Sequence, residues 1–400
     1  MKLSHGLHLA YCTNVHRGET WAETFDSLKR NTLKVRDRVC PKEPYAIGLR
    51  LSNQAAVELR DRNLLLEFQK WLGENRCYVF TINGFPYGQF HGTRIKEQVY
   101  SPDWTTPDRL AYTNLLVDLL AQLLPAGVEG SVSTLPCGFK LLISTAEEWK
   151  IIRDNLWRCV EHTARVSTQT GRKLHVGLEP EPMCLLETSD EVIHLFDRLR
   201  AEHPKDPRLS EYLGVNYDTC HFAVEFEEPQ NAIAALEKHG IKISKFHLSS
   251  ALKLRPSQAA REALAAFDEG IYLHQVVVRR PDGQRTIYLD LDDALACEPR
   301  MSEEAGEPLG STEWRVHFHV PLHSPPTALF GNTSDHILGI LDLLQTKPSL
   351  CSHLEMETYT WEVLPSEFKA WDVVDQLVAE YEWTLGRLAE RGLCELAQPE

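Results

Sequence analysis

Short apolar segments alternate with longer helical segments along most of this 400-residue chain. The segments with the composition of buried strands are 6–12, 45–51, 77–83, 128–134, 173–179, 212–218, 241–248 and 351–358. Helices are predicted between them, among others at 189–201, 229–239, 257–268, 334–346 and 366–391. Thr20 with Glu23, and Thr145 with Glu148, have the spacing of a capping box. Eight strands alternating with helices predict an α/β fold, the (β/α)₈ TIM barrel.

One stretch, from about residue 270 to 325, departs from this alternation. It contains two strand-like segments, 272–279 and 285–290, around a Pro-Asp-Gly turn, and a further one at 314–320. These features predict a β-rich insertion between the seventh and eighth barrel strands. Because no linker or change of composition divides the chain, residues 1–400 are expected to form a single domain.

The composition excludes some partners and favours one compartment. A net charge of −15 is unfavourable for binding nucleic acid, which depends on Lys and Arg at the phosphates. No uninterrupted apolar run approaches the roughly 20 residues needed to span a bilayer. The first residues lack the pattern of a secretory signal, and the 10 cysteines include no CxxC pair. We therefore expect a soluble, cytoplasmic protein with reduced thiols, no membrane span and no nucleic-acid partner.

Polar residues follow several of the predicted strands, at the end where a TIM barrel carries its functional groups. Glu179 ends the fifth strand, Asp218 the sixth and His247 the seventh, while Glu355 and Glu357 lie on the eighth. Each has an ordinary structural explanation, such as helix capping by Asp218 or core packing of His247. Their coincidence at four successive strand ends instead favours a divalent metal site. Oxygen ligands with one His favour Mn²⁺, Mg²⁺ or Co²⁺, and additional histidines would favour Zn²⁺.

These strand ends also carry a family resemblance. The runs Leu-Glu179-Pro, Tyr-Asp218-Thr-Cys-His221 and Phe-His247-Leu-Ser resemble the metal-binding strand ends of the xylose-isomerase-like superfamily. That superfamily includes ketose 3-epimerases and endonuclease IV-type enzymes. The resemblance implies a metal held by Glu, Asp, His and a final Glu, with the two Glu residues also moving the substrate proton. Here the fourth ligand would be Glu357.

The choice of Glu357 depends on its Met-Glu-Thr-Tyr context, which is more similar to the family's final Glu. Glu355 stays an alternative ligand, since residues two apart share a face of a strand. The catalytic residues implied by the resemblance are Glu179 and Glu357. His221 matches a family position that contacts substrate or a second metal.

A closer resemblance extends over nearly the whole chain. Residues 81–88, 90–97, 100–104 and 355–362 are similar to those of the EboE family of metabolite traffic proteins. This implies a small-molecule metabolite and partners among other proteins of the same gene cluster, which is implicated in moving a metabolite precursor towards the periplasm. It does not supply a reaction. We therefore expect an isomerase- or epimerase-like metal site, with a non-catalytic binding or delivery component as the alternative and an endonuclease IV-like phosphodiesterase as a third interpretation.

Further residues are predicted to contact substrate oxygens: His221, His91, Arg50 and His319. His317 and His319 alternate on one predicted strand and so point to the same side. If a multinuclear zinc site like that of the endonuclease IV-type enzymes were present, these histidines could complete it. Arg94 and Lys96 could hold an anionic group, although a lid is the simpler interpretation. In the delivery interpretation the residues stacking on a ligand would be Phe85, Tyr87, Trp104, Tyr359 and Trp361.

Overall fold

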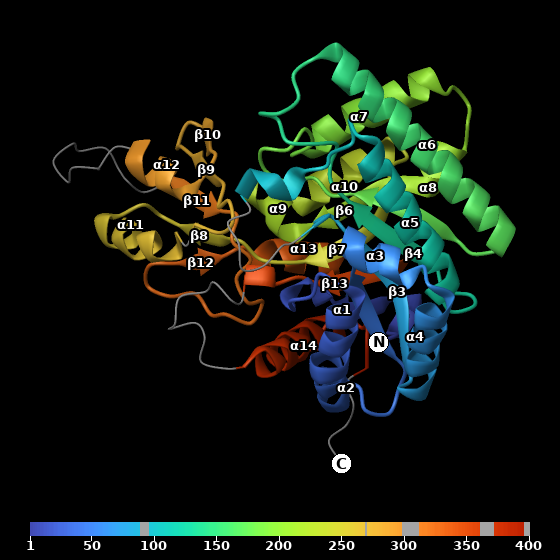
Figure 1. The fold of residues 1–400 in the computed structure, drawn as a ribbon. Helices are drawn as coiled ribbons and strands as arrows, with labels where there is room; N and C mark the ends of the chain where they lie inside the picture. The colour runs from blue at the N-terminus through green and yellow to red at the C-terminus, as the bar shows by residue number, and fades with distance from the viewer. Residues whose placement is uncertain (89–95, 269, 298–311, 361–371, 396–400) are drawn as a thin grey trace.

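The computed structural model describes residues 1–88, 96–268, 270–297, 312–360 and 372–395 (Figure 1). Within these residues one sheet contains eight parallel strands in the order β1-β13-β7-β6-β5-β4-β3-β2. A parallel bridge between Cys12 and Gly48 brings β1 beside β2 and closes the sheet into a barrel. The strands are β1 (His8–Tyr11), β2 (Tyr45–Arg50), β3 (Cys77–Gly84), β4 (Gly130–Thr134), β5 (Leu174–Leu178), β6 (Leu213–Asp218), β7 (Lys242–Leu248) and β13 (His353–Met356). The predicted α/β barrel is confirmed.

Helices surround this barrel and mostly follow the predicted segments (Figure 1). They are α1 (Trp21–Ser27), α2 (Leu33–Val39), α3 (Asn53–Leu59), α4 (Arg62–Glu74), α5 (Pro107–Leu123), α6 (Ala146–Thr170), α7 (Ser189–Glu202), α8 (Arg208–Tyr212), α9 (Thr219–Val224), α10 (Pro229–Lys238), α13 (Ser334–Thr346) and α14 (Val373–Ala389). Both predicted capping boxes are present, at Thr20 and Thr145. The predicted last helix, 366–391, is observed from Val373, and residues 366–371 lie outside the described residues. None of the helices in the described part of the chain is long and apolar enough to cross a membrane.

Polar side chains fill the interior of the barrel below its carboxyl end. The rings of His175 and His353 stack with centroids 5.6 Å apart, and Ser131 Oγ lies 2.8 Å from His353 Nδ1. These three side chains are buried. Because they occupy the lower part of the interior, the space open to a ligand lies at the carboxyl ends of the strands, where functional groups of this fold sit.

The insertion forms a second sheet, antiparallel, in the order β10-β9-β11-β8-β12. Its elements are β8 (Leu252–Leu254), α11 (Gln258–Leu264), β9 (Val276–Arg279), β10 (Arg285–Tyr288), α12 (Leu291–Cys297), β11 (Glu313–Val316) and β12 (Gly331–Asn332). Figure 1 shows this sheet projecting from one side of the barrel. The predicted hairpin and third strand are present. The insertion is wider than the predicted 270–325, because β8 precedes and β12 follows that range and both pair into the second sheet.

Two arginines of the insertion attach it to the turn that follows α9. The guanidinium groups of Arg279 and Arg315 lie 4.1 and 4.0 Å from the centre of the Phe226 ring, a cation–π distance. Arg315 also donates from Nη1 to the Ala223 carbonyl oxygen at 2.6 Å. These contacts fix β11 against the barrel, and the chain that leaves β11 carries His317 and His319 to the mouth.

Candidate metal centre

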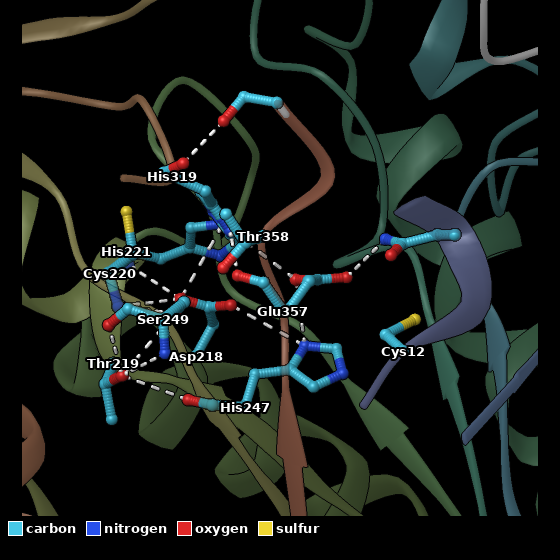
Figure 2. Close-up of polar contacts among 12 residues, drawn as sticks. Cys12, Asp218, Thr219, Cys220, His221, His247, Ser249, His319, Glu357 and Thr358 are labelled. Carbon is cyan, nitrogen blue, oxygen red and sulfur yellow. Dashed lines mark hydrogen bonds and ion pairs between the residues drawn. The ribbon is translucent and has the colours of Figure 1, made fainter. Parts of the chain in front are cut away.

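Four buried side chains converge at the carboxyl ends of β5, β6, β7 and β13. Ligand atoms of Glu179, Asp218, His247 and Glu357 all lie within 4.8 Å of one another. His247 Nδ1 is central, at 2.9 Å from Glu179 Oε1, 3.3 Å from Glu357 Oε2 and 3.6 Å from Asp218 Oδ2. Figure 2 shows the Asp218 and Glu357 side chains reaching towards one another beside the His247 ring. The four residues predicted as metal ligands are therefore brought together.

Asp218 serves two purposes with its two oxygens. Oδ1 accepts hydrogen bonds from the backbone N–H of Cys220 at 2.7 Å and of His221 at 3.1 Å, and so caps α9. Ser249 Oγ donates to the same oxygen at 2.5 Å. Oδ2 is buried and has no hydrogen-bond partner among the described residues. Helix capping and a place in the cluster are thus compatible, because each uses a different oxygen.

The unpartnered oxygens indicate that a cation fits here. Glu179 Oε2 and Asp218 Oδ2 are both buried without a hydrogen-bond partner in the described part of the chain. A buried carboxylate oxygen without a partner is costly, and a cation between such oxygens would remove that cost. Burial disfavours ionisation of Asp218, but nearby His221 and His247 hold its pKa well below the usual range. The charged carboxylates and the imidazole are the donor set of a hard divalent cation.

The protonation of His247 reflects the same excess of negative charge. Burial disfavours the imidazolium, yet the charges of Glu357 and Glu179 raise the pKa of His247 well above its usual range. Without a cation, the ring itself is therefore the positive charge closest to these carboxylates. A bound divalent cation would take over that role and leave His247 Nδ1 as a neutral ligand atom.

Glu355 lies apart from the cluster. Its Oε2 accepts a hydrogen bond from His247 Nε2 at 2.7 Å, on the opposite edge of the ring from Nδ1, and it forms an ion pair with Lys245. Glu357, in contrast, presents Oε2 to Nδ1, while its Oε1 accepts from Asn14 Nδ2 at 2.7 Å and Asn83 Nδ2 at 3.1 Å. The geometry therefore groups Glu357, and not Glu355, with the other three side chains.

Three further histidines lie above this cluster: His221, His317 and His319. Their ring centroids are 4.7, 5.5 and 5.4 Å apart. Each Nδ1 lies within hydrogen-bond distance of a carbonyl oxygen, namely Pro180 O at 2.8 Å for His221, Gln275 Oε1 at 2.7 Å for His317 and Glu357 O at 3.0 Å for His319. A proton on Nδ1 leaves Nε2 as the ligand atom, and Nε2 of His317 and His319 is buried without a partner in the described residues.

This arrangement supplies a second group of potential ligands that shares Asp218 with the first. Atoms of Asp218, His221 and His319 lie within 4.8 Å of one another, and so do atoms of Cys220, His317 and His319. Imidazole and thiolate ligands suit Zn²⁺ better than Mg²⁺. Figure 2 shows His319, on the chain that leaves the insertion, reaching the barrel residues His221 and Asp218.

A cleft of about 560 Å³ opens above the cluster. Its polar lining consists of Glu179, Glu181, Glu357, His221, His317, Asn14, Asn83 and Lys96. The apolar and aromatic lining comes from Phe85, Pro86, Val99, Tyr100, Tyr272, Leu273 and Tyr359. The cleft thus joins a charged end at the barrel axis to a wall built partly by the insertion.

Glu181 lies at the boundary between these two parts. Tyr100 donates to Glu181 Oε1 at 2.8 Å, and Gln275 Nε2 donates to the Tyr100 hydroxyl at 2.9 Å. Burial raises the pKa of Glu181 well above its usual range, and the charges of Glu179 and Asp218 act in the same direction, against the Tyr100 hydrogen bond. Glu181 therefore holds a proton more readily than an ordinary glutamate does.

The other predicted contact residues have different positions. Arg50 is buried, donates to the carbonyl oxygens of Gly18 and Gly88 at 2.7 Å, and lines a separate small pocket instead of the cleft. Lys96 lines the cleft but forms an ion pair with Asp290. His91 and Arg94 lie outside the described residues.

The predicted aromatic residues also divide into two groups. Phe85 and Tyr359 line the cleft. Trp104 is buried and donates from Nε1 to the Leu135 carbonyl oxygen at 3.0 Å, and Tyr87 packs against Tyr112 with centroids 5.1 Å apart. Both are therefore packing residues. Trp361 lies outside the described residues.

Several polar residues of this region are not among those predicted from the sequence. Asn14 lies shortly after β1, and Asn83 is the second-last residue of β3, so both lie at the carboxyl ends of barrel strands and position alone could have indicated them. Lys245 lies two residues before His247 on the same strand, a spacing that places both on one face. Gln275 and Tyr100 lie far from any barrel strand end in the sequence. Tyr100 begins the 100–104 run that resembles the EboE family, but that resemblance assigns it no role.

Comparisons with known proteins identify the fold. No protein-family model and no curated protein sequence matches the chain. Among solved structures, L-ribulose 3-epimerase is similar with a TM-score of 0.51 at 13% identity, over 98% of this chain and 100% of that chain. A xylose isomerase domain protein from Planctomyces limnophilus is similar with a TM-score of 0.51 at 14% identity, over 90% of this chain and 94% of that chain. The fold is that of the xylose-isomerase-like barrels.

Proposed function

We propose that this protein is a divalent-cation-dependent isomerase or epimerase that moves a proton on a small polyhydroxylated or carbonyl metabolite. The observation that carries the proposal is the convergence of Glu179, Asp218, His247 and Glu357 within 4.8 Å, with Glu179 and Glu357 lining the cleft. Three of these side chains offer an oxygen that faces the other ligands. The cleft above them leaves room for substrate oxygens at the same cation.

The chemistry follows from charge. A bound cation would hold a carbonyl and a neighbouring hydroxyl of the substrate and lower the pKa of the C–H bond between them. Glu179 and Glu357 are the proposed base and acid: one carboxylate takes the proton from carbon, and the other returns a proton to the same or the adjacent carbon. Asn14 and Asn83 restrict Glu357 by holding its Oε1, so that Oε2 faces the site.

The ligand set favours Mn²⁺, Mg²⁺ or Co²⁺, because three of its four members are carboxylates. Isomerisation by hydride shift would need a second cation. The nearby atoms of Asp218, His221 and His319 support a place for it, and the additional imidazole of His317 favours Zn²⁺ there. We propose that His221 and His319 otherwise bind substrate oxygens.

We infer that the metabolite belongs to the traffic in which EboE-like proteins take part, within the cytoplasm and together with other proteins of the same gene cluster. The sequence runs at 81–88, 90–97, 100–104 and 355–362 are the support for this role. It is compatible with catalysis, since a metabolite can be altered before it is passed on.

A second candidate function is binding and delivery without turnover. The aromatic side of the cleft favours it, because Phe85, Tyr272 and Tyr359 offer faces for stacking on a flat ligand. The two functions differ in one respect that can be measured. An enzyme that works by proton transfer exchanges a substrate proton with solvent, whereas a carrier neither exchanges that proton nor converts the metabolite.

The first experiment is metal analysis of protein purified after metal-replete preparation. We expect at least one divalent ion per chain in the wild type, and a large loss in Glu179→Gln and in His247→Ala, both checked for folding by circular dichroism. A wild-type protein with metal well below one per chain would rule out the proposed reaction. With metal present, ketoses screened in D₂O should take up deuterium at carbon. Tight binding of a metabolite with neither deuterium exchange nor conversion to an isomer would support delivery instead.

A further inference from the structure

A buried ion pair lies directly beneath the proposed metal site. Lys245 on β7 is 1% exposed and Glu355 on β13 is 0% exposed. Lys245 Nζ contacts Glu355 Oε2 and lies 3.4 Å from Ser133 Oγ. Removing two such charges from water costs several kcal/mol per ion, and apolar residues of similar volume are often as good for stability. Stability alone therefore does not explain the pair.

The pair is connected to the site through the His247 ring. The Glu355 oxygen that contacts Lys245 also accepts a hydrogen bond from His247 Nε2 at 2.7 Å. A proton held on Nε2 by Glu355 leaves the lone pair of the neutral ring on Nδ1. Nδ1 is the atom that faces Glu179, Asp218 and Glu357. Glu355 therefore determines which nitrogen of His247 is available as a ligand.

The local backbone is built to allow this contact. In the pairing of β6 with β7, Val215 lies opposite Ile243 and Asn216 opposite Lys245, so that Ser244 is an extra residue on β7. After this irregularity Lys245 and His247 both face the barrel interior. On β2, a Cβ at Gly48 would lie 1.8 Å from Glu355 Oε1. The glycine thus leaves the space in which the Glu355 carboxylate lies.

We propose that Glu355 and Lys245 are positioning residues of the metal site. Glu355 fixes the orientation and tautomer of His247, and Lys245 neutralises the Glu355 charge so that no fourth uncompensated carboxylate lies beside the three ligand carboxylates. This inference depends on the proposed function, since it assigns the pair a role towards the same cation. It excludes Glu355 as a direct ligand.

Co²⁺ is the probe for the experiment, because its affinity is measurable by calorimetry and its visible spectrum reports ligand geometry. Two double variants give matched comparisons. Lys245→Met/Glu355→Gln keeps a neutral acceptor for His247 Nε2–H, whereas Lys245→Met/Glu355→Leu removes it and leaves an apolar filling. We expect the Leu variant to bind Co²⁺ about 10- to 100-fold more weakly than wild type, with an altered spectrum. The Gln variant should retain most of the affinity.

A purely structural ion pair predicts that both double variants bind Co²⁺ with wild-type affinity and spectrum, and that result would overturn the proposal. Loss of all Co²⁺ binding in Lys245→Met/Glu355→Gln, as severe as in Glu357→Gln, would also overturn it, because Glu355 would then act as a ligand and not as the acceptor for His247 Nε2–H. If wild-type protein binds no Co²⁺, the proposed function fails and the positioning role fails with it. Wild-type binding with unaffected double variants leaves the proposed function standing.

Discussion

Asn14 and Asn83 hold one oxygen of Glu357 from two different strand ends, and this contact is open to a direct test. Replacing Asn83 by Ala removes the donor 3.1 Å from Glu357 Oε1 and loosens the carboxylate. Hydrogen bonds to charged groups contribute about 1.5–3 kcal/mol. We therefore expect Asn83→Ala to weaken Co²⁺ binding about 10-fold, measured by calorimetry.

Asn155 provides the control for this variant. It is also buried and donates from Nδ2 at 2.9 Å, but to the Trp104 carbonyl oxygen, and neither residue lines the cleft. Asn155→Ala should lower the melting temperature and leave Co²⁺ affinity unchanged. Equal affinities in Asn83→Ala and wild type would show that Asn83 does not restrain Glu357.

At Gly48 the packing leaves no room for a Cβ atom. A Cβ there would lie 1.8 Å from Glu355 Oε1 and 2.7 Å from the Tyr11 carbonyl oxygen, which is backbone and cannot easily move. Gly48→Ala should lower the free energy of unfolding by about 1–3 kcal/mol, as overpacking does. In Gly73→Ala, on α4, nothing lies within 4 Å of the new atom, so that variant should gain up to about 1 kcal/mol. Urea unfolding of both variants measures the difference.

The convergence of the four proposed ligand residues could be predicted from sequence, because the barrel topology gathers strand ends whatever the details of packing. To predict that Glu179, Asp218 and His247 lie close together, it was enough to identify correctly the strands that carry them. Strand periodicity alone could not distinguish Glu355 from Glu357, because it places both on one face and does not give the depth of each side chain along the barrel axis. The role of Arg50 also depended on partners, Gly18 and Gly88, that only the fold brings near.

At the scale of elements, α14 is tied to the barrel mouth by one buried acid. Glu380 accepts hydrogen bonds from Thr358 Oγ1 at 2.7 Å and from the Leu322 N–H at 3.1 Å. Burial raises the pKa of Glu380 from 4.5 to about 7, although its hydrogen bonds act in the opposite direction. The native protein therefore keeps a proton that the unfolded chain has already lost between about pH 4.5 and 7.

This difference sets the sign of a pH effect. Because the native state binds the extra proton, the Glu380 contribution lowers the free energy of unfolding as pH rises through that window, by up to roughly 3 kcal/mol. Glu380→Gln should remove this part of the pH dependence and be more stable than wild type at pH 8. Denaturant unfolding at pH 5 and pH 8 measures it. Glu382→Gln, at an exposed position of the same helix, should follow wild type.

The insertion illustrates what local patterns can and cannot predict. Its hairpin, β9 and β10, could be predicted from the sequence, because a turn signal lies between two β-rich segments. Strands β8 and β12 are only three and two residues long, and they exist because they pair with a sheet whose other strands come from elsewhere in the chain. Such short strands have no periodicity of their own. Their pairing is decided by tertiary contacts.

At the scale of the whole molecule, the proposed metal site would link function to stability. The carboxylates of Glu179, Asp218 and Glu357 and the Glu355–Lys245 pair are buried within one barrel, so the fold without a cation bears unfavourable charge that a cation would offset. A cation that binds the native state only stabilises it by about 2.7 kcal/mol at 100 times its Kd. We expect Mn²⁺ or Co²⁺ to raise the melting temperature of chelator-treated protein by several degrees, increasingly with concentration. Glu179→Gln should lose most of this increment, because it lacks a ligand, while Glu382→Gln should keep it. An increment of equal size in Glu179→Gln would mean that the cation stabilises the protein somewhere other than the barrel mouth.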